Sequence, residues 1–525
     1  MSKHSNLLWT TGLCLGWAFD LLFWKQPLGI NFFLYGLLCI LGACLVLLVN
    51  KQSPARGSLL VFPLIFVFAA ITAVRSEPMT VLLAICLTLL LMIVLANTYL
   101  GGRWLVYGFG DYLGAVLGLA GSMIGRPVGF GAQVRKQRLE SGSTGKRLNI
   151  WPVVRGVLIA VPIVAIFAGL LAAADAAFSS QLDAVLKIFN IENLPQYIFR
   201  MIYILIGAYA LVGVILHAST QSTDEKLTGG EKPFITQFLG FTEAGIVLGS
   251  VAVLFAAFVV IQFRYFFGGQ ANIHVAGFTY SEYARRGFGE LVVVAFFSLL
   301  MILALGAVTR RESVLQRRTF SGLSVAIVAL VLVMLVSAYQ RLVLYESAYG
   351  FSRLRTYTHV ALVWIGLLLV AVVVLEIFQR QKAFVPAMLI ASLGFVLSLA
   401  VLNVDGLIVR QNVDRAIRGQ DLDVTYLVSL STDSIPVLAE LYESPSTPAV
   451  ARDALGAALF CHLKTDAAPS SRDWRGFTVS AWQADLAMQR VPAQLKGYGV
   501  LDPDWPMRVR TPGGEVYSCR GQGID

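Results

Sequence analysis

Stretches of about 20 apolar residues recur along the chain, separated by short polar connectors. A run of 18 or more apolar residues can cross the roughly 30 Å hydrocarbon core of a bilayer as a helix. The pattern predicts an all-α fold, in which residues 1–403 form a polytopic transmembrane helix bundle. About eleven spans are expected, at residues 6–24, 29–49, 57–74, 78–97, 151–172, 197–217, 238–263, 288–308, 321–342, 358–378 and 383–403.

The rest of the chain, residues 404–525, follows a different pattern. Apolar residues recur there at helical spacing but are interrupted by Asp, Pro and Ser-Thr-Asp, which predicts short packed helices. The stretch VLDPDWPMRVRTPGGEVYSC favours a small hairpin or loop around Gly513 and Gly514. A tail of about 120 residues can bury a core of its own. We therefore expect a small, mainly helical C-terminal domain that ends in a loop or hairpin.

Basic residues in the connectors predict the orientation. They follow the second, fourth, eighth and tenth predicted spans: Lys51, Arg56, Arg126, Arg135, Lys136, Arg138, Lys146, Arg147, Arg310, Arg311, Arg317, Arg318, Arg380 and Lys382. With this set of spans all these connectors lie on one side, which the positive-inside rule makes cytoplasmic. The N-terminus is then cytoplasmic and the C-terminal domain extracytoplasmic.

Residues 104–125 leave an alternative open. Their sequence, WLVYGFGDYLGAVLGLAGSMIG, is apolar enough to span and has Asp111 as its only charge. If it spanned, the basic run 126–147 would lie outside, against the positive-inside rule. We therefore expect residues 98–150 to form a cytoplasmic interfacial or re-entrant segment and a basic loop within the membrane domain.

Composition supports the membrane class and narrows the chemistry. The chain is 57% hydrophobic and 14% charged, whereas a soluble domain carries about 25% charged residues. The net charge of +10 reflects the basic connectors, and no basic stretch carries a stacking platform for nucleic acid. No P-loop, HExxH or GxSxG motif is present, and the Cys and His residues lack metal-ligand spacing. The sequence predicts no metal, cofactor or nucleic-acid partner and does not favour an enzyme.

Four polar clusters, residues 19–29, 274–291, 339–359 and 402–415, fall at the predicted outer ends of spans. The candidate ligand-binding residues in them are Asp20, Glu282, Tyr283, Arg285, Arg286, Glu290, Tyr349, Arg353, Arg355, Tyr357, Asn403 and Asp405. Interfacial tyrosines and snorkelling arginines explain single members. Arginine–acid pairs on the side where basic residues should be scarce indicate partners across the bundle or a polar cavity. A ligand site and a structural ion-pair network fit the clusters equally well.

The cluster at 274–291 predicts a helix that continues into the eighth span. Thr279 and Glu282 fit a capping box, so the helix is expected to begin near Thr279. Glu282, Arg286 and Glu290 follow at intervals of four residues, an acid–base–acid ladder on one face. By contrast, charges such as Arg200 and Glu376 near the ends of other spans fit snorkelling or paired residues better than a proton relay.

Several motifs resemble a known family. YARRGF (283–288), YGFSRLRTY (349–357), NVDGLI (403–408) and the later LDVTYLVSLSTDSIPVL (422–438) resemble a bacterial membrane-protein family described as domain of unknown function 4173. NVD stands where that pattern has NPD, which keeps the Asn and the Asp. The resemblance covers most of the chain. It implies a multi-pass protein of the bacterial cytoplasmic (cell inner) membrane and supplies no activity.

Three functions stay open. In the first, the protein binds or moves an envelope lipid or other anionic ligand at its outer face, where arginines hold anionic oxygens. In the second, it is a non-catalytic scaffold or sensor component whose C-terminal domain binds an envelope protein. In the third, it is an intramembrane transferase that uses Glu282, Asp20 or Asp405, although no nucleophile or base accompanies them. Ser and Asp in LVSLSTDSIPVL suit helix caps, and Cys461 and Cys519 are a candidate disulfide outside the cytoplasm.

Overall fold

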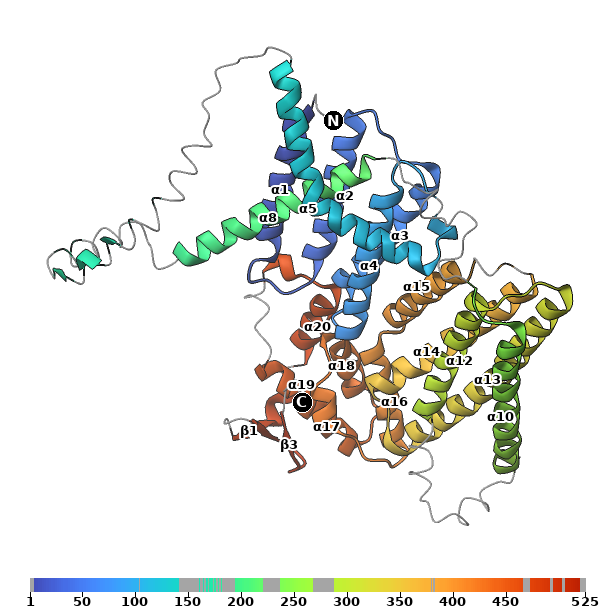
Figure 1. Cartoon of the computed structure of the whole chain (residues 1–525). Coiled ribbons are helices and arrows are strands. Elements are labelled where there is room, and N and C mark those ends of the chain that lie inside the picture. The colour runs from blue at the N-terminus through green and yellow to red at the C-terminus, as the bar shows by residue number, and fades with distance from the viewer. Residues whose placement is uncertain are drawn as a thin grey trace. The chain divides into compact units, whose positions relative to one another are not determined.

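The computed structural model describes residues 4–102, 104–140, 194–220, 237–267, 288–378, 380, 383–465, 473–491, 494–502 and 506–519, with scattered residues between 160 and 181. These parts of the chain are mainly helical (Figure 1). The chain forms two compact units, which are described separately below. Unit 1 comprises Met1–Trp24, Leu38–Ser53 and Gly118–Thr220, and unit 2 comprises Lys25–Leu37, Pro54–Leu117 and Gln221–Asp525.

Eleven helices within the described residues are long and apolar enough to cross a membrane. They belong to α1 (Ser5–Phe23), α2 (Ile30–Val49), η2 and α3 (Arg56–Leu60 and Val61–Val74), α4 (Pro78–Thr98), α5 (Phe109–Glu140), α8 (Leu194–Ala218), α10 (Phe241–Phe267), α12 (Phe288–Val308), α13 (Val314–Tyr349), α14 (Arg353–Ile377) and α15 (Phe384–Leu402). The polytopic helix bundle predicted from the apolar runs is therefore confirmed as the fold class.

The set of helices differs from the predicted set in one place. Most of the predicted span 151–172 lies outside the described residues. Helix α5 qualifies instead, because Gly110–Gln137 is long and apolar enough to cross a membrane. It extends well past the predicted segment 104–125, through Pro127 and into the basic residues. The interfacial position that we expect for this segment stays a prediction, and so does the side of the membrane on which the C-terminal residues lie.

In unit 1, glycines bring α1 and α8 together. A Cβ atom at Gly12 would lie 2.6 Å from Cγ2 of Val212, and one at Gly16 would lie 2.6 Å from the carbonyl oxygen of Ile204. A side chain at Gly16 would therefore clash with the backbone of α8, and one at Gly12 would require Val212 to move. Small residues that let two backbones approach closely are typical of helix packing in membranes, where apolar side chains gain little by leaving lipid.

In unit 2, α10, α12, α13 and α14 share a core of buried apolar side chains, and α15 packs between α14 and α4. Trp364 of α14 fills the space above Gly394 of α15, and its indole N–H donates to Oγ of Ser398 at 3.1 Å. Helix α13 has 36 residues, which corresponds to about 54 Å at 1.5 Å per residue. Because this exceeds the roughly 30 Å hydrocarbon core, α13 extends beyond the membrane at one or both ends.

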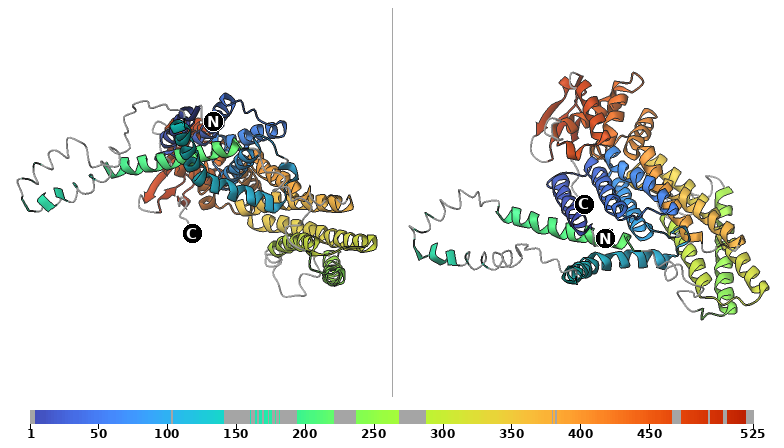
Figure 2. Two further views of the ribbon diagram at one scale, coloured as in Figure 1. Left: turned by 45° about the horizontal axis from the view of Figure 1, so that its top comes forward. Right: turned by 90° about the horizontal axis from the view of Figure 1, so that it is seen from above.

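The described residues between 404 and 519 form what we call the C-terminal cap, at one end of α14 and α15 (Figure 2). Its helices are α16 (Val404–Ile417), α17 (Val424–Val428), α18 (Ile435–Glu443), α19 (Ala449–Thr465) and α20 (Val479–Arg490), with short 3-10 turns η8 (Thr432–Ser434), η10 (Trp474–Gly476) and η11 (Gln494–Gly497). Strands β1 (Gly499–Asp502), β2 (Arg508–Arg510) and β3 (Val516–Ser518) form an antiparallel sheet in that order. The hairpin predicted around Gly513 and Gly514 is present between β2 and β3, where Gly514 adopts a φ of 91°.

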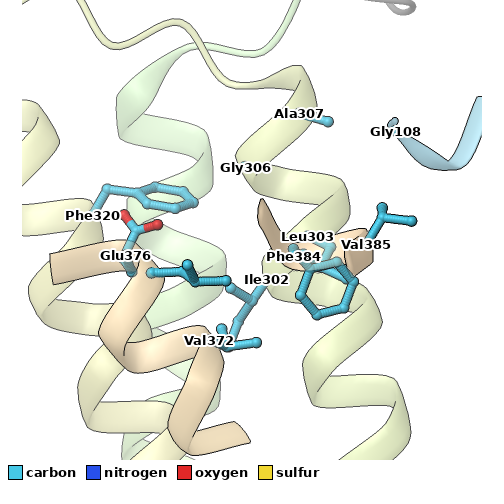
Figure 3. Close-up of a pocket in the computed structure, with 11 residues that line it drawn as sticks. Gly108, Ile302, Leu303, Gly306, Ala307, Phe320, Val372, Glu376, Phe384 and Val385 are labelled. Carbon is cyan, nitrogen blue, oxygen red and sulfur yellow. The ribbon is translucent and has the colours of Figure 1, made fainter. Parts of the chain in front are cut away.

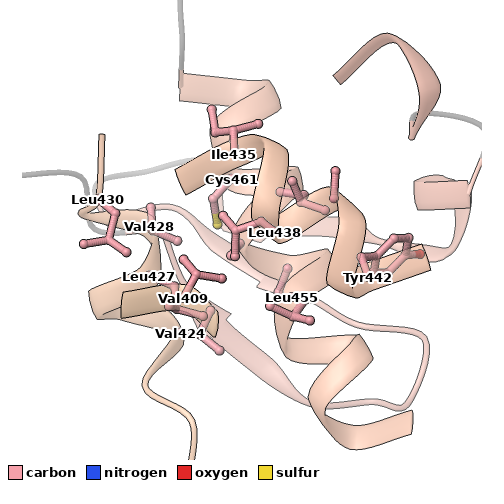
Figure 4. Packing of buried hydrophobic residues seen from close by; sticks show 14 of the residues in the cluster. Val409, Val424, Leu427, Val428, Leu430, Ile435, Leu438, Tyr442, Leu455 and Cys461 are labelled. Carbon is pink, nitrogen blue, oxygen red and sulfur yellow. The ribbon is translucent and has the colours of Figure 1, made fainter. Parts of the chain in front are cut away.

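The core of the cap continues into the ends of the spans. Val409, Leu438 and Leu455, which Figure 4 shows packed together, belong to a cluster that also includes Leu399 of α15. Partly buried side chains from α4, α14 and α15 complete it, among them Leu83 and Phe395. The cap is therefore a layer that closes one end of the bundle through shared apolar packing.

A disulfide joins Cys461 of α19 to Cys519, which follows β3. Both cysteines are fully buried, their Cα atoms are 5.4 Å apart, and 58 residues separate them in sequence. Disulfides typically stabilise a fold by roughly 2–4 kcal/mol, and chain-entropy arguments place a loop of this size near the upper end of that range. We therefore expect Cys461→Ala/Cys519→Ala to lower the free energy of unfolding of the cap by that amount, measured by limited proteolysis of the purified protein over a range of temperature.

The matched control is Cys39→Ala, because Cys39 is also buried but lies in α2, outside the cap. The control should leave the resistance of the cap to protease unchanged. Equal resistance of the double variant and the unmodified protein would contradict a stabilising role for the bond.

Candidate functional site

The candidate residues from the sequence fall in different parts of the structure. Arg353, Arg355, Tyr349, Tyr357, Asn403 and Asp405 lie together in unit 2, whereas Asp20 lies in unit 1. Glu290 is exposed in the first turn of α12. Glu282, Tyr283, Arg285 and Arg286 lie outside the described residues, as does the capping box at Thr279. The clusters 339–359 and 402–415 are thus brought together, and the ladder at 282–290 stays a prediction.

A buried ion pair between Arg353 and Asp405 lies at the centre of the unit 2 residues. Arg353 begins α14, and its Nε and Nη2 donate to Oδ1 and Oδ2 of Asp405 at 2.8 and 2.6 Å. Asp405 is fully buried, and its Oδ2 also accepts the backbone N–H of Ser431 at 2.7 Å. Two parallel charge-assisted bonds and one backbone bond satisfy this carboxylate, which would be costly to bury alone.

The conformation of Asn403 positions Asp405 next to Arg353. It adopts a left-handed conformation, with φ of 48°, and forms the junction between α15 and α16. Its side-chain oxygen accepts the N–H of Gly406 at 3.2 Å, so the same residue ends one helix and caps the next. Asparagine tolerates the left-handed region better than most residues. The sharp junction turns the first turn of α16, including Asp405, toward α14.

A second carboxylate of the cap, Asp433, binds the start of α4. Its Oδ2 accepts the backbone N–H groups of Ser76 and Glu77, both at 2.8 Å, and its Oδ1 lies 3.5 Å from Nη1 of Arg75. The N–H groups at a helix N-terminus have no partner within the helix and carry a partial positive charge. Asp433 therefore fastens the cap to the α3–α4 connector.

Glu77 and Tyr357 connect this contact to α14. Glu77 is the N-cap of α4, and its carboxylate accepts the N–H groups of Met79 and Thr80 at 2.8 Å each. The hydroxyl of Tyr357 donates to the same carboxylate. Tyr426 of the cap completes the group, because its hydroxyl oxygen accepts the backbone N–H of Arg353 at 2.8 Å. The hydroxyls of Tyr357 and Tyr426 are thus hydrogen-bonded to other groups of the protein.

Arginines 355 and 415 bind the C-terminal end of α13. Arg415 donates to the carbonyl oxygens of Ser347 and Ala348 at 3.2 and 3.0 Å, and Arg355 donates to that of Gly350. These carbonyls have no partner within the helix, and the negative end of the helix dipole favours cations there. Within the described residues neither arginine has a carboxylate partner. Burial, with the positive charges of Arg355 and Arg418, lowers the pKa of Arg415.

In unit 1, Asp20 belongs to a separate closed cluster. Nε and Nη2 of Arg200, in α8, donate to its two oxygens at 2.8 and 2.5 Å, and the hydroxyl of Tyr203 donates to Oδ1. Trp24 stacks on Tyr203 and lies under the Arg200 guanidinium, 5.0 Å from the ring centre. Asp20 is 3% exposed. The cluster therefore joins α1 to α8 at one end of their contact.

These geometries bear on what the site can do chemically. Asp20 and Asp405, two of the three carboxylates considered for catalysis, each accept a bidentate arginine and are held away from a proton-transfer role. Glu282 lies outside the described residues. In the described ranges no group of three or more His, Cys, Asp or Glu side chains is placed to hold a metal ion. The arrangement around Arg353 satisfies its own charges and acts as a structural lock, a name we use for Arg75, Glu77, Arg353, Asp405 and Asp433.

Long apolar helices with paired charges at their ends define a multi-pass membrane protein as the class. The chain belongs to the family described as Domain of unknown function (DUF4153), which matches residues 61–441. Domain of unknown function 4173, the family that the motifs resemble, is not the one that matches. The motif stretches between 283 and 438 lie within the matched region, but short motifs did not distinguish the two families. No curated protein and no solved structure matches the chain.

The lock predicts a specific pattern of double-mutant energies. Arg353→Met alone leaves Asp405 buried without its cation and should cost about 3–5 kcal/mol. Asp405→Asn alone leaves Arg353 without its anion and should cost a similar amount. The double variant removes both charges, while the asparagine oxygen still accepts the N–H of Ser431, so it should recover most of the loss. Thermal unfolding of the four purified proteins measures the cycle.

Additive losses in the double variant would contradict the lock. A ligand site at Arg353 predicts a different result, namely single variants that accumulate in the membrane at normal levels. The exposed pair Arg410–Glu440, with atoms 2.8 Å apart, is the matched control. Its coupling energy should be no more than about 1 kcal/mol, because solvent screens it.

Proposed function

We propose that the protein is a non-catalytic membrane scaffold that holds its C-terminal cap rigidly for an envelope protein partner. The observation that carries this proposal is the attachment of the cap to the spans by buried charges that satisfy one another. Asp405 binds the start of α14, and Asp433 binds the start of α4. A buried ion pair contributes little net stability but fixes geometry, because a misplaced partner leaves a charge uncompensated. Such attachment suits a domain that must present its surface to a partner in a fixed position relative to the spans.

Two observations support an extracytoplasmic position of the cap. The cap carries the Cys461–Cys519 disulfide, and disulfides persist mainly in oxidising compartments. The arginines of the connector 309–318 lie at the opposite ends of α12 and α13, where the positive-inside rule predicts cytoplasm. Because the motifs resemble those of a bacterial membrane-protein family, we propose the bacterial cytoplasmic membrane as the location of the chain.

Exposed apolar side chains on the cap offer positions for a partner. Val450, at the start of α19, is 73% exposed, and Trp482, on α20, is 51% exposed. Exposed tryptophans are enriched among the residues that carry binding energy in protein interfaces. We propose that the partner contacts the cap at one or both of these positions.

A second candidate function keeps the outer-face ligand. Arg355 and Arg415 contact backbone carbonyls and have no carboxylate partner in the part of the chain that the structure describes. An anionic lipid headgroup would add the missing negative charge, since arginine binds phosphate oxygens through paired bonds. Exposed Tyr349 lies nearby on α13.

Site-specific photo-crosslinking in cells tests the scaffold. A photoreactive amino acid at Trp482 or Val450 is expected to capture one discrete protein partner. The same amino acid at Val253, a 71% exposed residue within α10, is the control and should capture none. Asp433→Ala should weaken the captured band at least several-fold because it releases the cap from α4, whereas Asp433→Asn, which keeps an acceptor oxygen, should weaken it less. Identical capture at cap and span positions would refute the proposal.

The variant Arg355→Gln/Arg415→Gln tests the second candidate. Glutamine can still donate to the helix carbonyls, so the main change is the loss of two positive charges. On the scaffold proposal the number of anionic phospholipids bound in native mass spectrometry stays the same, and the melting temperature falls by a few degrees. Loss of one bound anionic lipid with an unchanged melting temperature would favour the ligand site instead.

A further inference from the structure

A cavity of about 410 Å³ lies among α12, α13, α14 and α15 (Figure 3). Its walls are mainly apolar side chains, including Ile302, Leu303, Phe320, Val372, Phe384 and Val385. Glu376 is the one ionisable residue among those that line it. This volume falls within the range of about 300–1,000 Å³ that is typical of pockets for small organic ligands.

The cavity lies at the end of the bundle opposite the cap. Gly306 and Ala307 belong to the last turn of α12, Glu376 to the last turn of α14, and Phe384 to the first turn of α15. The cap, by contrast, contacts Arg353 at the first turn of α14. Ala307 is exposed at the surface of the bundle and lines the cavity. In a bilayer this end of the helices lies near the lipid headgroups of one leaflet.

The charge of Glu376 is already compensated. Its Oε1 accepts the hydroxyl of Ser321 at 2.5 Å and lies 3.8 Å from Nη1 of Arg311. Arg311 also donates to the carbonyl oxygen of Gly306 at 2.7 Å and covers the ring of Phe320. These contacts hold the pair against the wall of the cavity. The cavity therefore has an apolar interior and a neutral polar rim.

The connector beside the cavity carries surplus positive charge. Residues 309–318, TRRESVLQRR, contain four arginines and one glutamate. Arg310, Arg317 and Arg318 are exposed, and the first two donate to backbone carbonyl oxygens. Within the described residues, Arg311 is the one arginine of this connector with an acidic partner. The exposed guanidinium groups are free to bind phosphate oxygens in addition to these carbonyls.

We propose that this cavity holds one acyl chain of an anionic phospholipid, whose phosphate binds the arginines of the 309–318 connector. Water is a poor occupant, because a wall of this composition offers it few hydrogen-bond partners. An acyl chain matches the wall, and basic pockets between spans bind anionic headgroups. This site is independent of the cap and of any partner that the cap binds.

Native mass spectrometry of the full-length protein in detergent, titrated with phosphatidylglycerol, tests the acyl-chain part. Ala307→Phe fills the cavity and is expected to weaken binding of one lipid at least tenfold. Ala304→Phe is the matched control, since Ala304 is also exposed on α12 but does not line the cavity. Val385→Trp fills the same space from α15, so the test does not depend on the folding of one variant. Unchanged binding in both cavity-filling variants would overturn the proposal.

The headgroup part is tested with phosphatidylcholine of the same acyl chains as competitor. The unmodified protein should prefer phosphatidylglycerol at least tenfold at this site, and Arg310→Gln/Arg317→Gln/Arg318→Gln should abolish the preference. Lys136→Gln, which removes a similarly exposed charge from α5, should leave it intact. Equal affinity of the unmodified protein for both lipids would overturn the assignment of an anionic headgroup, even if Ala307→Phe blocks binding.

Discussion

The ion pair between Arg353 and Asp405 is the interaction on which the arrangement of the cap depends. A carboxylate with no exposed surface has no water to solvate it, so its partner must be supplied by the fold. Arg353 supplies two charge-assisted bonds from the start of α14, and Ser431 supplies a third bond from the cap. Because these groups come from three segments, satisfying one charge determines how α14, α16 and the following loop lie together.

The surrounding contacts follow the same rule, applied to helix ends. The N–H groups just before and within the first turn of α4 need acceptors, and Asp433 and Glu77 provide them. The last carbonyls of α13 need donors, and Arg355 and Arg415 provide them. Each charged side chain has the sign that the adjacent helix dipole favours. The cap therefore completes the hydrogen bonding of helices that end near the membrane surface, where unsatisfied backbone groups are costly.

Local signals in the sequence predicted much of the fold, whereas contacts between side chains that are distant in sequence could not be predicted. Apolar runs located most of the spans, and Gly513 and Gly514 indicated the hairpin, because both signals lie within a few residues. The serine and aspartate of LSTDS were interpreted as helix caps. Ser431 does cap the 3-10 turn η8, whereas Asp433 binds the N–H groups of Ser76 and Glu77, which directly precede α4. Glu77 next to Pro78 is a recognisable N-cap signal that the polar clusters did not include. Arg200 was interpreted as a snorkelling or paired residue; it is paired, although nothing local in the sequence indicates Asp20 as its partner.

The balance of charge distinguishes the two ends of α13 and α14. At the cap, Arg353 and Arg75 lie against Asp405 and Asp433, and Arg355 and Arg415 are at least partly buried against the last carbonyls of α13. At the other end, Arg311 and Glu376 neutralise each other, and the remaining arginines of the connector have no acidic partner among the described residues. Charged side chains that pair with one another hold parts of the fold together. Exposed arginines without an acidic partner are instead compensated by ions or lipid headgroups outside the protein. Recognition of an anion is therefore favoured at the cavity end, and the cap end is suited to holding a surface in place.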